Sequence, residues 1–517
     1  MKSPLALARR IRAVRQDERG YVLALTALLL IPLLLVAAMA VDFGGWYTAA
    51  TKQQKAADAA ALAGVVWLPN LTQAASVAKD VSKQNGFDDA LANITVTVTQ
   101  LSDTEIKVDV LDSDSPVYLS SLVNASQSIK RTAKAKYVLP VPLGSPKNFF
   151  GTGQMQPAAS RENFFAAING FCAYKDQGGP FEARRYDAVP KGGANACTAG
   201  ATLNPQYKDS PAPAYQYYVD LPAGRTQTFH LYIYNPEMAT SGAFRDPTNP
   251  SGTTVTTNYD LLAPDSTPFD DGDNTSYTSC NGGAAQPNPR SYDTVTDNDA
   301  TFFGTAGWSN FCSFTTSATA GRYILNIRTL ENQATSNASQ AFSFLMQPGS
   351  STTVATTCDT RTDTTCPNIY GKNWMSIYAN ATSASGFGNF FLAKIGPEHA
   401  GKTLKITLFD PGEGGQAIRI LDPGGGFATF IAQDMGIDGA TPSTALTAST
   451  TLDVTGQRYN GHYVELTIEL TGGYDTNASF LAAGWWWKVR YEFASASVTD
   501  RTTWGVKVIG DPVHLTG

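Results

Sequence analysis

Residues 21–41, YVLALTALLLIPLLLVAAMAV, form a 21-residue run without a charged side chain. A helix of this length covers about 30 Å, which is the thickness of the hydrocarbon core of a bilayer. Six basic residues precede the run within positions 1–20, and Asp42 follows it. Because basic flanks stay on the cytoplasmic side, we predict a single-pass cell-membrane protein with residues 1–20 in the cytoplasm and the bulk of the chain extracellular.

The flanks of the apolar run fit a membrane boundary. Trp46 and Tyr47 fall at the level expected for an interfacial aromatic belt, and Pro32 inside the run is tolerated in a membrane helix. The alternative is a cleavable signal peptide, since residues 38–40 (AMA) have the small-x-small form of a cleavage site. The apolar core of a signal peptide spans only about 7–15 residues, so we favour the uncleaved anchor.

The charge distribution restricts the class of partner. The chain carries 38 basic and 44 acidic residues, and the first twenty residues hold six of the basic and two of the acidic ones. The remainder therefore has 32 basic and 42 acidic groups, a net charge of −10. Such an acidic body argues against nucleic acid as a partner.

Catalytic residue types are scarce. The sequence has only four His, and it contains neither a G-x-S-x-G nor an H-E-x-x-H motif. His230 and His462 both lie in strand-like runs, where we expect half-exposed strand positions. We therefore predict that the protein is not an enzyme and uses no cofactor.

The cysteine residues indicate an oxidising compartment. All six lie after the apolar run, namely Cys172, Cys197, Cys280, Cys312, Cys358 and Cys366. Six cysteines allow 15 pairings, and proximity in the sequence favours 172 with 197, 280 with 312, and 358 with 366. A metal site is the alternative, but there is no C-x-x-C motif and no nearby His pair, so we predict disulfides.

Helical sequence continues beyond the apolar run. Residues 43–66 are rich in Ala, and residues 71–84 read as a second helix that ends at Asn85-Gly86. The small residues at positions 56, 57, 60, 61 and 64 permit close helix–helix approach. Equally, Ala simply favours helix, and the sequence does not separate these two interpretations.

The period then changes from helical to strand-like. Residues 94–98 (ITVTV) and 106–110 (IKVDV) alternate with period two, and residues 128–138 resemble a third strand after a short helix at 118–123. We therefore predict an α+β stalk domain over residues 42–138. The Pro- and Gly-rich residues 139–147 are predicted to be a linker.

Three motifs around the apolar run resemble a known family. They are Arg19-Gly20, residues 40–44 (AVDFG) and residues 54–63 (QKAADAAALA). Together they resemble the N-terminal module of TadE/TadG-like Flp (tight adherence) pilus-assembly proteins. In that family an R-G dipeptide opens one membrane helix, A-V-D-x-G closes it, and an L-Q-x-A-A-D-A-A-A-L-A-like run follows.

This resemblance extends over the following strands, to about residue 138. It implies a structural component of a Flp pilus-assembly or secretion apparatus, with the helix contacting the membrane and other pilus-assembly proteins. Prepilin-type substrates of related systems carry Glu where this chain has Leu25, which argues against processing after Gly20.

The rest of the chain reads as two antiparallel β-sandwiches, at residues 148–349 and 373–517, joined by a Ser/Thr-rich linker at 350–372. Short β-branched and aromatic segments alternate with Gly, Pro, Asn and Asp throughout. The predicted fold class is therefore α+β multidomain: a membrane helix extended into an α+β unit, then two sandwiches.

The two sandwiches look like a diverged tandem duplication. We align residues 163–168 with 373–378, 231–236 with 406–411, and 322–327 with 504–508. This layout resembles that of large actinobacterial TadG-like proteins.

One motif mimics a nucleotide site. Residues 396–403 (GPEHAGKT) fit the G-x-x-x-x-G-K-[ST] pattern of a phosphate loop. That loop requires a helix after the Lys, so that the N-terminal amides of the helix hold the phosphates. Residues 403–408 alternate as a strand instead, so we predict a turn and no nucleotide.

Two acidic clusters could supply oxygen ligands to Ca²⁺, namely residues 270–274 (DDGDN) and the set Asp109, Asp112 and Asp114. Neither follows the EF-hand register, and Asp–Gly clusters are usually solvated turns, so no metal is predicted.

Residues 485–487 (WWW) begin a strand-like segment in which alternation predicts that Trp485 and Trp487 are buried and Trp486 exposed. An exposed Trp could stack on a sugar ring. The alternative function is therefore a surface adhesin or carbohydrate-binding protein that uses the same membrane anchor. An extracellular hydrolase is the weakest of the three hypotheses, for want of catalytic residues.

Overall fold

The computed structural model describes the greater part of the chain. The described residues are 18–68, 70–102, 104–115, 127–137, 141–150, 153–156, 164–169, 178–180, 184–185, 202–203, 215–234, 239–240, 256–265, 273–280, 290–293, 309–329, 339–348, 358–381, 386–412, 415–471, 473–493, 498–509 and 513–516. They form two compact units. The described residues of the first lie within Met1–Leu139 and Asp511–Gly517, and those of the second within Pro140–Asp265 and Asp270–Gly510.

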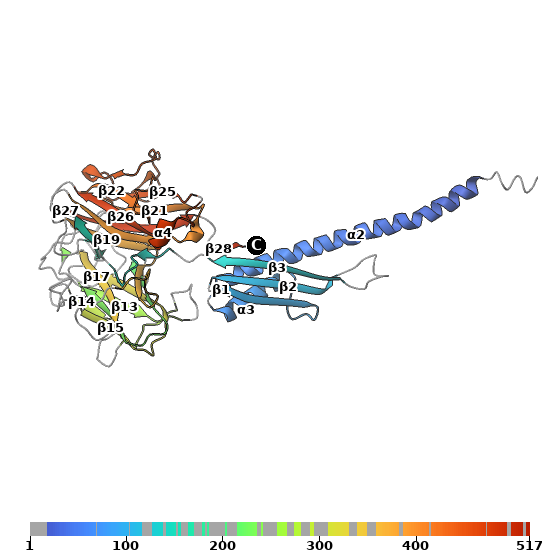
Figure 1. Ribbon diagram of the computed structural model, residues 1–517, viewed down its shortest axis with the longest axis horizontal. Helices are drawn as coiled ribbons and strands as arrows, with labels where there is room; N and C mark the ends of the chain where they lie inside the picture. The colour runs from blue at the N-terminus through green and yellow to red at the C-terminus, as the bar shows by residue number, and fades with distance from the viewer. Residues whose placement is uncertain are drawn as a thin grey trace, which may run out of the picture. The chain divides into compact units, whose positions relative to one another are not determined.

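The first unit begins with one long helix (Figure 1). Helix α2 (Glu18–Val65) has 48 residues and continues through Pro32. Helix α3 (Leu71–Gln84) follows, and the side chain of Asn70 caps it by accepting a hydrogen bond from the backbone N–H of Gln73 at 3.1 Å. Both predicted helices, at 43–66 and 71–84, are confirmed.

A four-stranded antiparallel sheet completes the first unit. Its strand order is β1-β2-β3-β28. The strands are β1 (Ile94–Ser102), β2 (Glu105–Ser115), β3 (Gln127–Tyr137) and β28 (Val513–Leu515). The three strands predicted between residues 94 and 138 are therefore present, while the short helix predicted at 118–123 lies outside the described residues.

Strand β28 pairs with a distant part of the sequence. Val513 lies opposite Tyr137 and Leu515 opposite Ala135, in antiparallel register. The backbone N–H of Thr516 adds a bond of 2.9 Å to the carbonyl of Lys134. Residues 513–515 were expected in the second sandwich, but they add a fourth strand to the first unit.

The second unit consists of two large antiparallel sheets. The first has the order β14-β13-β16-β10-β18-β4-β20-β26-β22-β24, with β6 also paired to β20. Its strands are β14 (Arg290–Asp293), β13 (Thr256–Leu262), β16 (Gly321–Thr329), β10 (Tyr215–Leu221), β18 (Asn368–Gly371), β4 (Leu143–Gly144), β20 (Phe387–Lys394), β26 (Trp486–Phe493), β22 (Gly415–Leu421), β24 (Leu452–Asp453) and β6 (Gly153–Gln156).

The second sheet has the order β15-β11-β17-β7-β19-β27-β21-β25-β23, with β12 and β5 also paired to β17. Its strands are β15 (Ser309–Phe314), β11 (Phe229–Tyr234), β17 (Ser339–Pro348), β7 (Phe164–Asn169), β19 (Trp374–Ala381), β27 (Val498–Ile509), β21 (Thr403–Phe409), β25 (Tyr463–Glu469), β23 (Ile431–Gly436), β12 (Ala239–Thr240) and β5 (Phe149–Phe150). A separate pair joins β8 (Arg184–Arg185) and β9 (Thr202–Leu203), and the short helices are η2 (Pro397–His399), η3 (Thr455–Gln457) and α4 (Ala478–Ala482).

The strand order shows that the two halves share one topology. In the first half, the strands β7, β10, β11, β13, β14, β15, β16 and β17 can be numbered one to eight in chain order. They then read 1-8-3-6 in one sheet and 2-7-4-5 in the other. The strands β19, β20, β21, β22, β24, β25, β26 and β27 of the second half give the same two orders. This arrangement is that of an eight-stranded jelly roll, so the second unit is a tandem pair of jelly rolls.

The topology supports the predicted duplication but changes part of its alignment. β7 corresponds to β19 and β11 to β21, as predicted. However, residues 322–327 lie in β16, whose counterpart is β26, whereas residues 504–508 lie in β27, whose counterpart is β17. The alignment of the last strands was therefore shifted by one strand, because short alternating segments resemble one another in either position.

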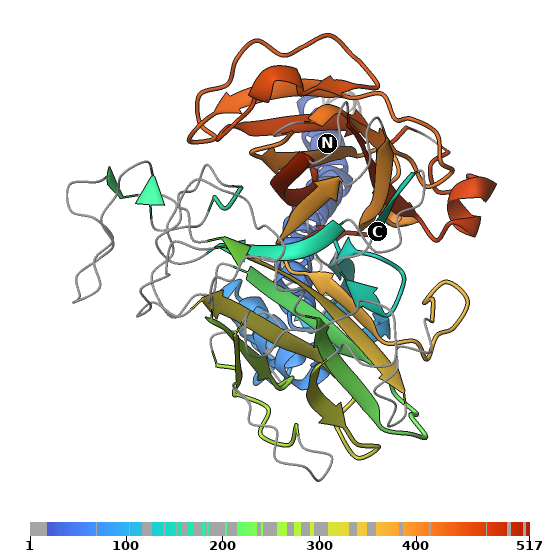
Figure 2. The ribbon, with the colours of Figure 1, turned by 90° about the vertical axis from the view of Figure 1, so that its left-hand side faces the viewer.

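The two halves are continuous with each other. β7 pairs with β19, with Phe165 opposite Tyr378, so the first strand of each jelly roll meets the other in one sheet. In the other sheet β18 and β4 lie between β10 and β20. Figure 2 shows β7 between the green-to-yellow strands of the first half and the orange-to-red strands of the second. The ranges expected as separate sandwiches thus share both sheets.

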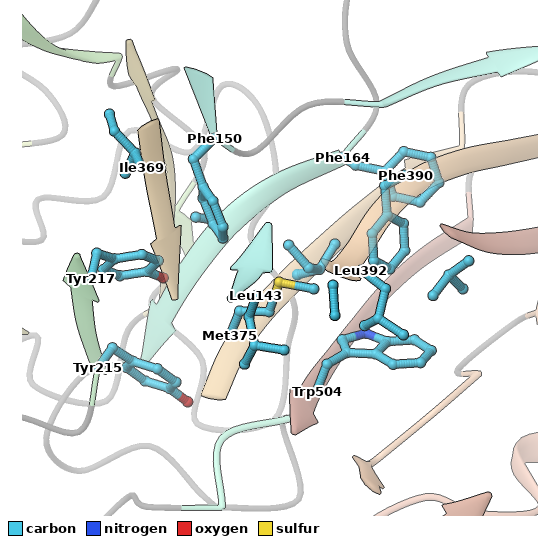
Figure 3. Close-up of a cluster of buried hydrophobic side chains, with 14 of the residues drawn as sticks. Leu143, Phe150, Phe164, Tyr215, Tyr217, Ile369, Met375, Phe390, Leu392 and Trp504 are labelled. Carbon is cyan, nitrogen blue, oxygen red and sulfur yellow. The ribbon is translucent and has the colours of Figure 1, made fainter. Parts of the chain in front are cut away.

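A single core lies between the two sheets and crosses from one half to the other (Figure 3). Phe164 of β7 packs against Phe390 of β20, with ring centroids 5.2 Å apart, and against Tyr491 of β26 at 6.0 Å. Phe390 in turn packs edge-on against Trp504 of β27 at 5.6 Å. A ring from the first half therefore fills the interior of the second.

Two predicted disulfides are present. Cys280 is bonded to Cys312 and Cys358 to Cys366, with Cα atoms 4.7 and 5.7 Å apart. Cys172 and Cys197 lie outside the described residues, so their pairing stays a prediction. Non-reducing peptide mapping would test it directly.

Candidate functional site: the N-terminal helix and its sheet

The N-terminal half of α2 exposes its apolar side chains. Among the described residues this is the one helix long and apolar enough to cross a membrane, and its most apolar stretch has no buried residue. Ile31 is 61% exposed and Leu33 69%. The hydroxyl of Thr26 donates to the carbonyl of Val22 at 2.7 Å, so its own helix satisfies it. Such internal satisfaction is what a bilayer interior requires of a polar group.

The helix changes character at Asp42. This carboxylate is only 1% exposed, although Phe43 beside it is 58% exposed. Phe43 packs edge-on against half-buried Trp46 at 5.3 Å, and Tyr47 is 76% exposed. That these aromatic rings mark a membrane boundary stays a prediction. Arg19 lies in the first turn of α2.

One buried glutamine ties the C-terminal half of α2 to the sheet. Gln53 is 1% exposed, and its side-chain amide donates to the carbonyl of Val110 on β2 at 2.9 Å. The same amide donates to the carbonyl of Ile129 on β3 at 2.8 Å. Gln53 therefore fixes the rotation of the helix about its axis, a role that sequence reasoning missed.

The motif at residues 54–63 is explained by this packing. Gln54 donates to Asp58 one turn later at 2.8 Å and to the carbonyl of Thr132 on β3 at 3.1 Å. Ala57 and Ala61 are fully buried in the core between the helices and the sheet. The alanine face thus lies against this unit's own strands and α3, which leaves the apolar N-terminal half as the helix surface open to partners.

At Gly64, helix α2 lies close to both α3 and β2. A Cβ atom there would lie 2.9 Å from the carbonyl oxygen of Ala74 and 3.0 Å from the side chains of Ala78 and Ile106. Any larger residue must push α3 or β2 away. By contrast, a Cβ at Gly44 in the same helix would meet nothing within 4 Å.

A charged cluster lies on the other face of the sheet. Asp109 of β2 accepts a hydrogen bond of 2.6 Å from Thr132 and lies 3.2–3.3 Å from the ammonium groups of Lys130 and Lys107. Burial alone would raise the pKa of Asp109, but these three partners outweigh it and hold the pKa below its usual range.

The other acidic residues weighed for Ca²⁺ have separate partners. The carboxylate of Asp112 accepts from Asn93, from Ser115 and from the backbone N–H of Asp114, all at 3.0 Å. No group of three or more metal-ligating side chains forms among the residues that the structure describes. Residues 270–272 lie outside that part of the chain.

The phosphate-loop lookalike is a turn. Residues 397–399 form the short helix η2, Gly401 takes a φ of +75°, and strand β21 begins at Thr403. The backbone N–H of Gly401 donates to the carbonyl of Leu470 at 2.6 Å, and Lys402 accepts in return from the N–H of Leu470 at 2.9 Å. The helix that would hold phosphate is replaced by a strand pair.

The prediction for the tryptophan run was wrong for Trp486 and only partly right for Trp485, which is partly buried and precedes strand β26. Trp486 is 2% exposed and Trp487 3%. Trp487 points into the core, where its Nε1 donates to Tyr474 at 2.9 Å. Trp486 faces the other side, but it packs against Phe391 of β20 at 6.1 Å. Alternation identified its side of the sheet correctly, yet neighbouring side chains cover it, so Trp486 offers no open sugar platform.

The histidines have local partners. Nδ1 of His230 on β11 lies 2.7 Å from the hydroxyl of Ser313 on β15, and burial lowers the pKa of His230. The Nδ2 amide of Asn310 converges on the same ring nitrogen at 3.3 Å. Nδ1 of His462 lies 3.0 Å from both carboxylate oxygens of Asp434. The first contact joins two strands, whereas His462 lies just before strand β25 (Tyr463–Glu469), and no catalytic set is assembled around either histidine in the described residues.

The comparisons with known proteins place the N-terminal module. Residues 20–75 match the Tad family, described as Flp pilus-assembly TadE/G-like. The match spans the exposed apolar segment, Asp42, Gln53 and the alanine face of α2. Residues 20–75 are thus similar to the TadE/G-like Flp pilus-assembly family, as the motifs predicted, and the match does not include the strands after α3. No curated protein and no solved structure matches the chain.

Proposed function

We propose that this protein is a membrane-anchored structural component of a Flp-type pilus-assembly or secretion apparatus. Residues 1–20 lie in the cytoplasm, α2 crosses the membrane, and everything after Asp42 lies outside the cell. In this role the exposed half of α2 contacts lipid and the membrane helices of other pilus-assembly proteins. The protein acts by anchoring and assembling, without a catalytic step.

The observation that carries this proposal is the continuity of α2. One helix joins an exposed, uncharged apolar segment to a TadE/G-like packed unit, without a break at Asp42. A rigid connection of this kind transmits position from the membrane to the folded unit. The basic residues before the apolar segment and the disulfides after it agree with the proposed orientation.

Protease accessibility tests the topology. Protease added to intact spheroplasts should digest the region after Asp42 and leave an N-terminal tag protected. A protected C-terminal region, or a mature protein that starts at Val41 or Asp42, would contradict the proposal. Loss of assembled pili in a deletion strain, restored by the full-length gene, would test the assembly role.

A further inference from the structure

The outer face of the second jelly roll carries a row of cations on strand β26. Val489 and Tyr491 of this strand point into the core. Because successive strand residues point to opposite faces, Lys488 and Arg490 lie on the outer face, about 7 Å apart along the strand. Across β20 and β22, their neighbours in register on that face include Phe391 and Arg419.

Aromatic rings hold these cations in place. The guanidinium of Arg490 lies 4.2 Å from the ring centroid of Phe387 and 5.1 Å from that of Phe427. The ammonium of Lys488 lies 4.8 Å from the centroid of Phe391. Arg490 also donates through Nε to the side-chain oxygen of Asn389 at 3.0 Å. The cation–π contacts thus orient the charges without neutralising them.

We define the β26 face as a set of four cations and three aromatic rings. The cations are Arg361, Arg419, Lys488 and Arg490, and the rings are those of Phe387, Phe391 and Phe427. Two of its cations have a carboxylate partner: Arg419 pairs with Glu492 at 2.7 Å and Arg361 with Asp359 at 2.6 Å. Within the described part of the chain, no carboxylate lies within salt-bridge distance of the other two, Lys488 and Arg490. The β26 face therefore has an excess of positive charge on an acidic protein.

The surroundings of Lys488 reflect this excess. Burial lowers the pKa of Lys488, and repulsion by Arg361 and Lys147 lowers it further. These neighbours disfavour the charged form of Lys488. An anion bound beside Lys488 would stabilise that charged form.

The matching face of the first jelly roll is closed. Arg322 lies on β16, the counterpart of β26, and it is held by both carboxylate oxygens of Asp220 at 2.9 and 3.1 Å. The hydroxyl of Tyr370 donates to the same carboxylate at 2.7 Å. The charge of Arg322 is therefore satisfied within the chain, unlike the charges of Lys488 and Arg490.

We propose that the β26 face binds an anionic glycan, a linear polysaccharide that carries carboxylate or phosphate groups. Charges repeated along a strand suit a polymer with regularly spaced anions, and the rings beside them offer apolar surface to sugar C–H groups. Duplex nucleic acid carries about one negative charge per 1.7 Å of helix axis, so the net charge of −10 on the remainder of the protein would repel it more strongly than a glycan with more widely spaced charges. An anionic bilayer is also less suitable, because the cations lie flat against the sheet, with Arg419 only 24% exposed.

Binding by the full-length protein in zwitterionic nanodiscs tests the proposal, with polygalacturonate and a phosphorylated mannan as probes and uncharged dextran as the blank. We expect saturable binding to at least one anionic glycan, weakened by added NaCl. The double variant Lys488→Gln/Arg490→Gln should weaken binding at least tenfold. Glu492→Gln should strengthen it about twofold or more, because Arg419 then loses its carboxylate partner; a misfolded protein would not show this gain.

The control variant Lys402→Gln/Lys507→Gln removes two positive charges from the other sheet and its turn, and it should bind within twofold of wild type. Four results would overturn the proposal: no binding to either anionic glycan, an equal loss in the control, no gain in Glu492→Gln, or tighter binding to duplex DNA or to anionic vesicles. The test does not depend on the role in pilus assembly.

Discussion

The two halves of α2 differ both in composition and in exposure. From residue 50 onward the helix is rich in Ala with polar residues between, and its Ala face is buried against strands and α3. From residue 21 to 41 it is mostly Leu, Val and Ile, and it is exposed. Of the 24 exposed large hydrophobic residues in the described part of the chain, 15 lie between Tyr21 and Tyr47. The more hydrophobic half is the one without protein neighbours.

This difference in exposure bears on the surroundings in which each half of the helix is stable. In water a continuous apolar surface of this size is unstable, and the Leu-rich half would be the one to bury itself. The packed half instead uses small residues and a buried amide to lie close to a sheet. The proposed membrane anchor accounts for this difference, with lipid around the first half and protein around the second.

The strongest test of this comparison is a charge in the exposed half. Ile31→Arg places a guanidinium at the middle of the apolar segment, where a bilayer opposes it by about 3 kcal/mol. We expect a large loss from the carbonate-resistant membrane fraction. Tyr47→Arg, beyond the boundary, should stay in that fraction, and an unchanged fraction for Ile31→Arg would mean that the segment does not span a membrane.

The next largest effect is expected from crowding the packed half. Gly64→Leu forces side-chain atoms against Ala74, Ala78 and Ile106, and should reduce the free energy of unfolding by about 2–3 kcal/mol. Gly44→Ala in the same helix has open space and should be neutral or slightly stabilising. Thermal unfolding of the two variants side by side measures the difference. Equal stabilities would show that α2 and α3 do not pack as described.

Removing the buried amide should have a smaller effect. Gln53→Ala leaves the carbonyls of Val110 and Ile129 without this donor, at a cost of about 1–2 kcal/mol. The neighbouring Gln54→Ala removes a partly exposed contact and should cost no more than about 0.5 kcal/mol. Chemical denaturation can measure the free energy of unfolding of both variants. An equal decrease in the two would argue against a specific role for Gln53.

The smallest expected effect depends on pH. The folded-state pKa of Asp109 is lowered, so its contribution to stability is present above its unfolded pKa and is lost as the pH falls through the folded value. We expect Asp109→Asn to reduce stability by no more than about 1 kcal/mol at pH 7, with the difference from wild type disappearing well below pH 4. Melting curves of both proteins from pH 7 to pH 3 would check this. A difference that persists at the lowest pH would exclude ionisation as its cause.

Local elements of the first unit could be predicted from sequence, whereas their partners could not. The bounds of α3 follow from the cap at Asn70 and the turn at Gly86, and the strands β1 and β2 follow from their alternation. Periodicity identifies which face of a strand is buried but not which strand lies beside it. For this reason the pairing of β28 with β3, and of β7 with β19, appeared only in the structure.

The candidate sites follow the same rule. The exposed apolar segment and the TadE/G-like motifs are each contiguous in sequence, so both could be identified from it. The β26 face was missed, although Lys488, Arg490 and Glu492 alternate visibly, because its rings come from β20 and from the turn after β22. Trp486 was placed on the correct side of its strand, but what covers it lies on other segments.

Strand β28 lies near the C-terminal end of the sequence, so the sheet of the first unit can be completed only after almost the whole chain has been synthesised. About 375 residues separate the end of β3 from the strand that completes its edge, and ribosomes add about 5–20 residues per second. For about 20–75 seconds of synthesis, the emerging first unit therefore presents β3 as an open edge. Any other extended segment that reaches β3 in that interval competes with a tail that has not yet been translated.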